Sequence, residues 1–278
     1  MDVKNFNTIP ETLPIKKIVK ETDTIWTFMF DYELGSKPGQ FVMLWIPDVD
    51  EKPFSIAYDD GKEFWLTIAK VGEATEELFK LKEGDLVGLR GPFGTGYSWS
   101  KCEHLVLLAG GYGAAPLYGL ARAAAVDGCK VDFVVGARSA DLLLYEDRVG
   151  ELSSEFDGAV KYCAATDDGS KGHKGYNTEV LEEILASKEG EDVKQIYACG
   201  PEMMMKKAAE IARDKGIKSE LALERYMKCG FGVCGQCCLD DSGVCVCKDG
   251  TVFDGERALG FSEFGKYHRD SVGRKVEW

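Results

Sequence analysis

The central fold of this chain is decided by the stretch Leu107-Leu108-Ala109-Gly110-Gly111-Tyr112-Gly113-Ala114-Ala115-Pro116-Leu117. A short apolar run, typical of a buried strand, passes through a glycine-rich turn into a segment with helical spacing. Such a turn exposes backbone amides at the start of a helix, where the pyrophosphate of a dinucleotide can bind. Because the stretch departs from the strict G-x-G-x-x-G pattern, an ordinary strand-to-helix turn explains it equally well when it is taken alone.

The same alternation of buried strands and helices continues along the chain. From residue 104 onward we expect strands at 105–109, 131–136 and 195–199, and helices at 116–125, 180–186 and 202–215. Strands that alternate with helices in this way form a parallel sheet. The sequence therefore predicts a central α/β domain.

A second turn lies at the end of the strand expected at 195–199, in the run Tyr197-Ala198-Cys199-Gly200-Pro201-Glu202-Met203-Met204. By itself, a Gly-Pro break followed by methionines usually marks a helix start with an apolar face. The carboxyl ends of parallel strands, however, meet at one edge of a sheet, and ligands of α/β folds bind there. Two such turns favour a ligand crevice, with the candidate residues Gly110, Gly111, Gly113, Cys199, Gly200 and Pro201.

The first hundred residues have a different pattern. Apolar and polar residues alternate in short runs at 25–30, 40–46 and 63–69, separated by turns such as Lys37-Pro38-Gly39 and Asp59-Asp60-Gly61. This pattern predicts a small antiparallel β-barrel, with one helix at 74–81 and a further strand at 86–90. We expect the barrel domain at 1–98, the α/β domain at 99–222 and a third, cysteine-rich module at 223–278.

Six of the ten cysteines fall between Cys229 and Cys247. Cys229, Cys234 and Cys237 stand at C-x4-C-x2-C, the spacing by which one tight loop wraps three thiolates around a plant-type [2Fe–2S] cluster. The glycines between them let the backbone approach an inorganic core closely. The loop therefore predicts an iron–sulfur cluster, and with it the transfer of single electrons.

A fourth ligand is needed, and the candidates are Cys238, Cys245 and Cys247. Cys238 is poorly placed because it directly follows Cys237 in the chain. Spacing alone does not choose between the other two. A structural zinc site and a disulfide knot are the alternatives, but zinc loops favour paired C-x2-C knuckles and disulfides are typical of short secreted chains.

Composition narrows the choice of partners and compartment. The 278 residues include 47 acidic and 34 basic side chains, and the net charge of −13 argues against binding to nucleic acid or to anionic membranes. The first residues lack the order of a signal peptide, and the longest apolar run, 105–126, is interrupted by Pro116 and Arg122. We expect a cytoplasmic protein in which the isolated thiols are buried, namely Cys102, Cys129, Cys163 and Cys199.

The order of these features resembles the ferredoxin–NADP reductase superfamily: the barrel, then Lys52-Pro53-Phe54-Ser55-Ile56, then Gly94-Thr95-Gly96, then the two turns. The cysteine loop narrows the resemblance, over almost the whole chain, to the electron-transfer subunits of type B dihydroorotate dehydrogenases. The runs that carry it are Glu224-Arg225-Tyr226-Met227-Lys228-Cys229 and Val246-Cys247-Lys248-Asp249-Gly250-Thr251-Val252-Phe253. In that family the cysteine of the second run is the fourth ligand, so the resemblance implies Cys247 and leaves Cys245 uninvolved.

The resemblance also implies FAD in the barrel and NAD at the two turns. Two departures from the family pattern concern the flavin: the usual arginine is Lys52, which keeps the charge without the bidentate contact, and Ala74 replaces a glycine. The first departure is expected to weaken FAD binding. The residues implied for FAD are Lys52, Pro53, Phe54, Ser55, Ile68, Ala69, Lys70, Ala74 and Thr75.

The implied activity is that of an oxidoreductase subunit in pyrimidine biosynthesis. A nicotinamide exchanges two electrons as a hydride whereas the cluster passes one at a time, so FAD stands between them as the converter. In the family, an FMN-containing catalytic subunit oxidises dihydroorotate, and the two kinds of subunit assemble as a heterotetramer. The dihydroorotate site is therefore expected on the partner.

Two other functions fit the same cofactors. One is the diaphorase subunit of a hydrogenase or of an anaerobic sulfite reductase, which has a similar barrel, sheet and cysteine loop. The other is a non-enzymatic redox-sensing protein in which flavin and cluster are structural. Neighbouring genes separate the first alternative from the dehydrogenase, and bleaching of the flavin by NADH excludes the second.

Overall fold

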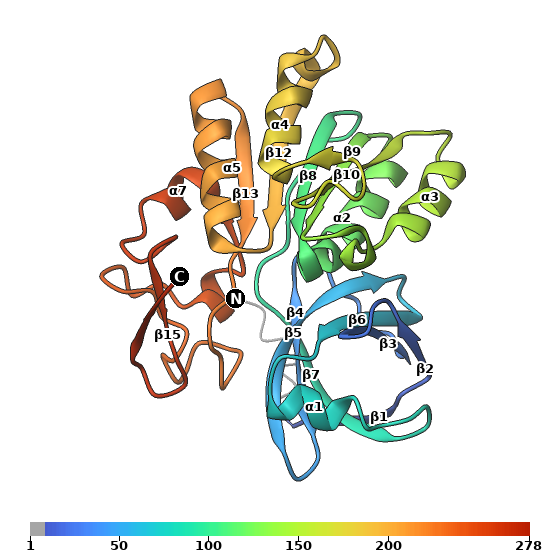
Figure 1. Cartoon of the computed structure of the whole chain (residues 1–278). Coiled ribbons are helices and arrows are strands. Elements are labelled where there is room, and N and C mark those ends of the chain that lie inside the picture. The colour runs from blue at the N-terminus through green and yellow to red at the C-terminus, as the bar shows by residue number, and fades with distance from the viewer. Residues whose placement is uncertain (1–8) are drawn as a thin grey trace.

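The computed structural model describes residues 9–278 of the chain. The first residues, on which the expectation of no signal peptide rests, lie outside this described part. Figure 1 shows three groups of elements: a curved N-terminal sheet, a central sheet flanked by helices, and a C-terminal segment beside helix α5 (Glu202–Lys215).

The N-terminal sheet has seven strands in the order β1-β7-β4-β5-β6-β3-β2, and every neighbouring pair is antiparallel. Alternate apolar side chains, among them Phe28, Phe30 and Leu66, form its core. A short helix, α1 (Glu73–Leu78), follows the sixth strand. The strands are β1 (Glu11–Pro14), β2 (Lys17–Lys20), β3 (Ile25–Asp31), β4 (Phe41–Ile46), β5 (Asp50–Asp59), β6 (Glu63–Ala69) and β7 (Leu86–Phe93).

The central sheet also has seven strands, in the order β11-β10-β9-β8-β12-β13-β14, and all pairs except β13–β14 are parallel. Three α-helices besides α5 accompany it: α2 (Ala114–Val126), α3 (Glu146–Glu155) and α4 (Asn177–Ala186). Its strands are β8 (His104–Gly110), β9 (Lys130–Ala137), β10 (Val160–Thr166), β11 (His173–Lys174), β12 (Val193–Cys199), β13 (Lys218–Ala222) and β14 (Val252–Asp254).

Helices cover both faces of this sheet, so its central strand β8 is buried along its whole length. Leu105 and Leu107 pack in one cluster with residues of α2 and α3, while Val106 and Leu108 pack in another with residues of α4 and α5. Burial on both faces explains why the strand reads as a continuous apolar run. No helix in residues 9–278 is long and apolar enough to cross a membrane.

The predicted combination of an antiparallel barrel with a parallel α/β sheet is confirmed. The sequence did not reveal α3 or β10. Helix α3 is predominantly polar and buries only Val149 and Leu152, and β10 contains the weak strand formers Ala164 and Ala165. The two elements pack against each other, and β10 also pairs with β9, so tertiary contacts rather than strong local signals hold them.

The barrel and the central sheet meet at α2. Gly119 of this helix lies against β5, where a Cβ atom would stand 2.9 Å from the carbonyl oxygen of Ala57. A glycine here therefore lets the helix approach the barrel strand closely. A hydrogen bond of 2.6 Å between the hydroxyls of Thr67 and Tyr145 adds a second tie between the two parts of the chain.

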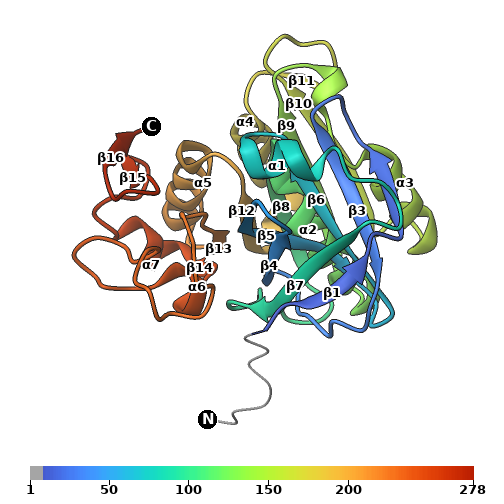
Figure 2. The ribbon, with the colours of Figure 1, turned by 90° about the horizontal axis from the view of Figure 1, so that it is seen from below.

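The C-terminal segment contains little regular structure: α6 (Val246–Asp249), α7 (Gly255–Leu259), and the strand pair β15 (Tyr267–Arg269) and β16 (Lys275–Glu277). Figure 2 shows the β15–β16 pair and the C-terminus beside α5, away from the barrel. Strand β14, from this segment, pairs with β13 and so extends the central sheet. The division at 98/99 and 222/223 stays a prediction.

Candidate cofactor sites

A cavity of about 210 Å³, here called the central cavity, lies where the three parts of the chain meet. The barrel contributes Ser55 and Ile68, and the two turns of the central sheet contribute Gly113 and Cys199. The remaining wall includes two segments that flank the cysteine loop, represented by Met227 and Thr251. The central cavity is thus the place where the predicted flavin, nicotinamide and cluster regions adjoin.

The residues expected to bind FAD gather around this cavity and a neighbouring one of about 530 Å³, here called the barrel cavity. The central cavity collects Pro53, Phe54, Ser55, Ile68, Ala69 and Thr75, and the barrel cavity collects Lys52, Pro53, Phe54, Ala74 and Thr75. Lys70 is exposed and lines neither. The shared residues make the two cavities one continuous cleft along β5 and the start of α1.

Lys52 contributes a positive charge to the wall of the barrel cavity, which Arg225 also lines. Lys52 forms an ion pair with Asp50 and lies 5.1 Å from the ring centre of Tyr226. Partial burial is the largest single effect and lowers the pKa of Lys52, but the hydrogen bond to Asp50, the Asp50 charge and the contact with Tyr226 together outweigh it, so the pKa is raised overall. Lys52 therefore carries a positive charge into the part of the cleft where a phosphate group would be stabilised.

Thr75 shapes the turn into α1. Its hydroxyl donates to the carbonyl oxygen of Gly72 over 2.8 Å and accepts from the backbone amides of Val71 and Gly72. Because the Thr75 hydroxyl is used in these hydrogen bonds, its role is to fix the backbone conformation of the turn that forms this part of the cleft wall. Ala74 is buried beside it.

The two turns of the central sheet press tightly together. A Cβ atom on Gly113 would lie 2.1 Å from the carbonyl oxygen of Cys199, and one on Gly200 would lie 2.8 Å from the backbone of Gly110. Only glycine allows this approach. Gly110, Gly111 and Pro201 line a further cavity of about 690 Å³, here called the turn cavity, whereas Gly200 supports the turn from outside it.

Tyr112 and Glu224 are among the residues of the central cavity that were not assigned from the sequence. The Tyr112 hydroxyl donates to Glu224 Oε2 over 3.2 Å, although the residues are 112 positions apart. Glu224 lines the central cavity with an exposed side chain; enclosure by the cavity walls raises the pKa of its carboxyl, and the Tyr112 hydrogen bond partly opposes the rise. The signal available in the sequence was the position of Glu224 shortly after the last parallel strand.

The cysteine loop brings the predicted ligands together in two pairs. Cys229 and Cys234 adjoin each other, and the backbone amide of Val233 donates to the Cys229 sulfur over 3.4 Å. Burial opposes ionisation of Cys229, but backbone amides of the loop, including those of Phe231 and Cys234, lower its pKa to about 6. Amides directed at sulfur favour the thiolate form that ligates metals.

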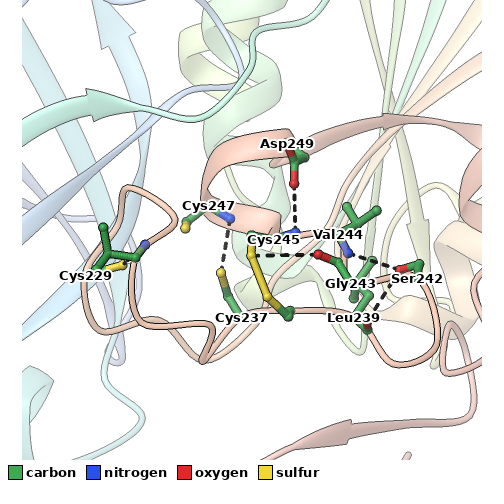
Figure 3. Close-up of a disulfide and its surroundings, with 11 residues drawn as sticks. Cys229, Cys237, Leu239, Ser242, Gly243, Val244, Cys245, Cys247 and Asp249 are labelled. Atoms are coloured by element: carbon green, nitrogen blue, oxygen red, sulfur yellow. Dashed lines mark hydrogen bonds between the residues drawn. A yellow bond between two sulfur atoms is a disulfide. The ribbon is translucent and has the colours of Figure 1, made fainter.

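The second pair is Cys237 and Cys247, both buried. The amide of Cys247 donates to the Cys237 sulfur over 3.4 Å, and Figure 3 shows the two side chains directed toward each other. A hydrogen bond between the two side chains, donated by the Cys247 thiol, lowers the pKa of Cys237 to about 7 and raises that of Cys247. Within residues 9–278 no three His, Cys, Asp or Glu side chains converge on a point suited to one metal ion. Two adjacent pairs of thiols fit a two-iron cluster better than a mononuclear zinc site.

The two remaining cysteines of the loop pair with each other. Cys238 and Cys245 form a disulfide, shown in Figure 3 beside the Cys237–Cys247 pair. The sequence left Cys245 without a partner, whereas the hairpin between residues 239 and 244 brings it opposite Cys238. Of the isolated thiols, Cys129 and Cys199 are buried as expected, Cys163 is partly so, and Cys102 is exposed at a turn, where the prediction of a buried thiol was wrong.

The segment after Cys247 ties the loop to the other parts. Thr251 donates through its hydroxyl to the carbonyl oxygen of Gly39 over 2.7 Å, and its own carbonyl oxygen accepts from the amide of Leu223. Thr95 donates to the carbonyl oxygen of Val252. The chain therefore runs from a predicted cluster ligand to the wall of the central cavity within four residues.

Comparison with protein families gives two matches. Residues 107–210 match the oxidoreductase NAD-binding domain, and residues 224–258 match the iron–sulfur cluster binding domain of dihydroorotate dehydrogenase B. The first match covers most of the central sheet, with both turns but without β13 and β14, and the second covers the cysteine loop.

Solved structures show the same fold. A chain of the NADH-dependent reduced ferredoxin–NADP oxidoreductase, studied for flavin-based electron bifurcation, superposes with a TM-score of 0.76 at 30% identity and covers 88% of each chain. An Amycolatopsis cytochrome P450 reductase superposes with a TM-score of 0.65 at 24% identity, over 74% of this chain and 66% of that chain. Together with the family matches, the first likeness supports FAD, a [2Fe–2S] cluster and NAD as the cofactors of this oxidoreductase.

Close relatives cover almost the whole chain. A Methanocaldococcus jannaschii protein is 45% identical over 267 residues, 96% of this chain and 98% of that protein. A Pyrococcus horikoshii protein is 41% identical over 270 residues, 96% of each chain. Both relatives are named probable dihydroorotate dehydrogenase B (NAD(+)), electron transfer subunit. This chain therefore belongs to the family of electron-transfer subunits of type B dihydroorotate dehydrogenases.

Proposed function

We propose that this chain carries electrons from an FMN-containing dihydroorotate dehydrogenase subunit to NAD in the cytoplasm, as part of a heterotetramer that serves pyrimidine biosynthesis. The observation that supports this function is the composition of the central cavity. Its wall combines barrel residues such as Ser55, turn residues such as Gly113, and residues next to the cluster ligands such as Met227 and Thr251. A flavin bound there exchanges a hydride with a nicotinamide and single electrons with a cluster.

The residues of the chain have separable roles in this proposal. Lys52, with its raised pKa, attracts the FAD phosphates, and Ser55 and Ile68 line the flavin ring. The turns at Gly113 and Cys199 bring the nicotinamide to the same cavity, and burial keeps the Cys199 thiol protonated by raising its pKa. Cys229, Cys234, Cys237 and Cys247 hold the cluster.

The partner is expected at the exposed tip of the cysteine loop. Val233 is 77% exposed there, between Cys229 and Cys234, so a partner that contacts this tip would lie beside the predicted cluster. Electron transfer requires close approach of the donor and acceptor, because its rate falls steeply with their separation.

Reconstitution tests the proposal. The isolated chain should reduce a dye with NADH and should not oxidise dihydroorotate; addition of the FMN subunit should give NAD-coupled dihydroorotate oxidation. Hydrogen exchange at Phe231, Val233 and Gln236 should slow in the complex. Dihydroorotate oxidation by the chain alone, or an FMN subunit that neither binds nor gains NAD-linked activity, would contradict the proposal and favour a diaphorase of another complex.

A further inference from the structure

A buried network of charged side chains joins three functional parts of the chain. Its centre is Arg225, in the segment between β13 and the cysteine loop, and its carboxylates are Glu202 and Glu263. The exposed fractions of the three side chains are only 4%, 4% and 2%. Charged groups as buried as these are uncommon unless they are paired.

Glu202 anchors the network at the nicotinamide turn. It is the first residue of α5 and directly follows Cys199-Gly200-Pro201. One of its carboxylate oxygens accepts from Arg225 Nη1. The other oxygen accepts from the Gly265 amide over 2.7 Å and from Trp278 Nε1 over 3.1 Å. A single carboxylate thus ties the turn to the segment that carries Arg225 and to the C-terminal segment.

Glu263 anchors the network at the cysteine loop. Its Oε1 accepts from Arg225 Nε over 2.6 Å, and its Oε2 accepts from the amide of Asp240 over 2.8 Å. Asp240 lies three residues after Cys237, and its own carboxylate accepts from the Arg269 guanidinium and the Tyr267 hydroxyl. A continuous series of polar contacts therefore links Arg225, through Glu263, to the cysteine loop at Asp240, close to the predicted ligand Cys237.

Arg225 itself belongs to the walls of the central and barrel cavities. Its Nη2 is enclosed by protein and makes no hydrogen bond within residues 9–278, while Nε and Nη1 are directed at the two carboxylates. The Arg225 side chain therefore fixes the positions of Glu202 and Glu263, and the Arg225 backbone forms part of the wall of the flavin cavity. Displacement of Arg225 would move the cavity wall and the loop relative to each other.

We propose that Glu202, Arg225 and Glu263 are positioning residues that fix the cluster module against the flavin cavity and thereby set the rate of electron transfer between FAD and the cluster. The cofactors do not touch these side chains in this proposal, which rests on the cofactor set of the proposed function. It concerns electron transfer inside the chain, so its failure would leave the proposed partnership with a catalytic subunit untouched.

The test is anaerobic stopped-flow mixing of the holo chain with NADH, which resolves bleaching of the flavin from bleaching of the cluster. Glu202→Gln is the informative variant. It leaves Arg225 and Glu263 as a one-to-one pair, but an amide has a single acceptor oxygen for the three donors that Glu202 now satisfies. We expect FAD and iron content and flavin bleaching to stay normal, while the flavin-to-cluster phase slows roughly tenfold, since small displacements of reacting centres cost rate steeply.

Arg225→Met should slow the same phase at least as much, and Arg225→Lys, which keeps the charge, should restore part of the rate. The matched control is Arg148→Met, which breaks another largely buried ion pair, between α3 and Glu21 of the barrel domain. It should lower the unfolding temperature and leave the transfer phase unchanged. Normal transfer in Glu202→Gln, or equal slowing in Arg148→Met, would overturn the proposal; if Arg225→Met does not fold, Glu202→Gln decides alone.

Discussion

The hydroxyl of Tyr112 donates a hydrogen bond to Glu224 at the wall of the central cavity, joining the first nicotinamide turn to the segment that leads into the cysteine loop. Both residues line this cavity, and Tyr112 also lines the turn cavity. Tyr112 therefore forms part of the boundary between the two cavities. The contact also places Glu224, a titratable group, at the predicted meeting point of flavin and nicotinamide.

The raised pKa of Glu224 predicts a pH dependence of stability. When a folded-state carboxyl has a raised pKa, the unfolded chain releases its proton first as the pH rises, so stability falls between the ordinary and the raised pKa. Glu224→Gln should therefore flatten the thermal unfolding temperature across this window. The effect should be modest because the carboxyl faces the open cavity and solvent screens it.

Tyr112→Phe provides the comparison. It removes the hydrogen bond that opposes the shift, so the pKa of Glu224 should rise further and the fall in stability should extend to higher pH. Thermal unfolding measured from about pH 4 to about pH 8 checks both variants. Parallel pH profiles for the wild type and Glu224→Gln would show that Glu224 does not titrate in this window.

The ligand set predicts the effects of cysteine substitutions. Cys247→Ser should remove most of the visible cluster absorbance and the bound iron, because serine is a poorer ligand for iron than a soft thiolate. Cys238→Ser and Cys245→Ser should leave both near normal, since these two sulfurs pair with each other rather than with the ligands. Iron analysis of the three purified variants decides, and equal iron loss from Cys245→Ser would reverse the assignment of the fourth ligand.

Lys52 is expected to hold FAD through its charge. Lys52→Met should weaken FAD binding roughly tenfold, about 1.4 kcal/mol, because a charge-assisted contact to phosphate is lost. The control is Lys70→Met, since Lys70 is exposed and lines neither flavin-side cavity. Titration of flavin-stripped protein with FAD measures both constants. If Lys70→Met weakened FAD binding as much as Lys52→Met, Lys70 would also belong to the flavin site and Lys52 would have no special role in it.

The close approach of the two turns predicts a strong effect at Gly113. A methyl group there would strike the Cys199 carbonyl oxygen, so Gly113→Ala should separate the turns and reduce NADH-to-dye activity by roughly a hundredfold while FAD and iron are retained. Gly150→Ala is the matched control, because Gly150 lies inside α3 and a methyl group there would meet no other part of the protein within 4 Å. It should keep full activity and stabilise the helix by about 0.5–1 kcal/mol. Full activity in Gly113→Ala would show that the two turns can move apart to accommodate a methyl group without loss of NADH oxidation.

Several features of the fold were open to prediction because their causes are local. Helix α5 spans 202–215 as expected, since a Gly-Pro break starts it and Gly216 ends it in the left-handed conformation. Strand β8 was recognisable because burial on both faces makes its sequence continuously apolar. By contrast, α3 and β10 depend on packing against neighbouring elements, and no local sequence pattern predicted them.

In the candidate site, too, some features have local causes and could be predicted, whereas others depend on tertiary contacts. The spacing of Cys229, Cys234 and Cys237 lies within one loop, so the sequence by itself predicted a cluster and, through the two glycine-rich turns, a dinucleotide crevice. Resemblance to a family, rather than spacing, was needed to select Cys247. Neither source gave the pairing of Cys238 with Cys245, which depends on the hairpin between them.

Contacts between segments far apart in the chain could not be predicted from local patterns. Arg225 meets Glu202 across 23 positions, Trp278 meets Glu202 across 76, and Tyr112 meets Glu224 across 112. Tyr112 and Glu202 stand in the two turns, and Arg225 and Glu224 in the run before the cysteine loop, but nothing in the sequence pairs them with one another. Local spacing indicated the cluster and the dinucleotide crevice, because a few neighbouring residues suffice to ligate iron or turn a strand into a helix, whereas FAD was implied by the resemblance to a family. The arrangement of those cofactors relative to one another depends on burial and hydrogen bonding between separate elements, and these arise only when the chain has folded.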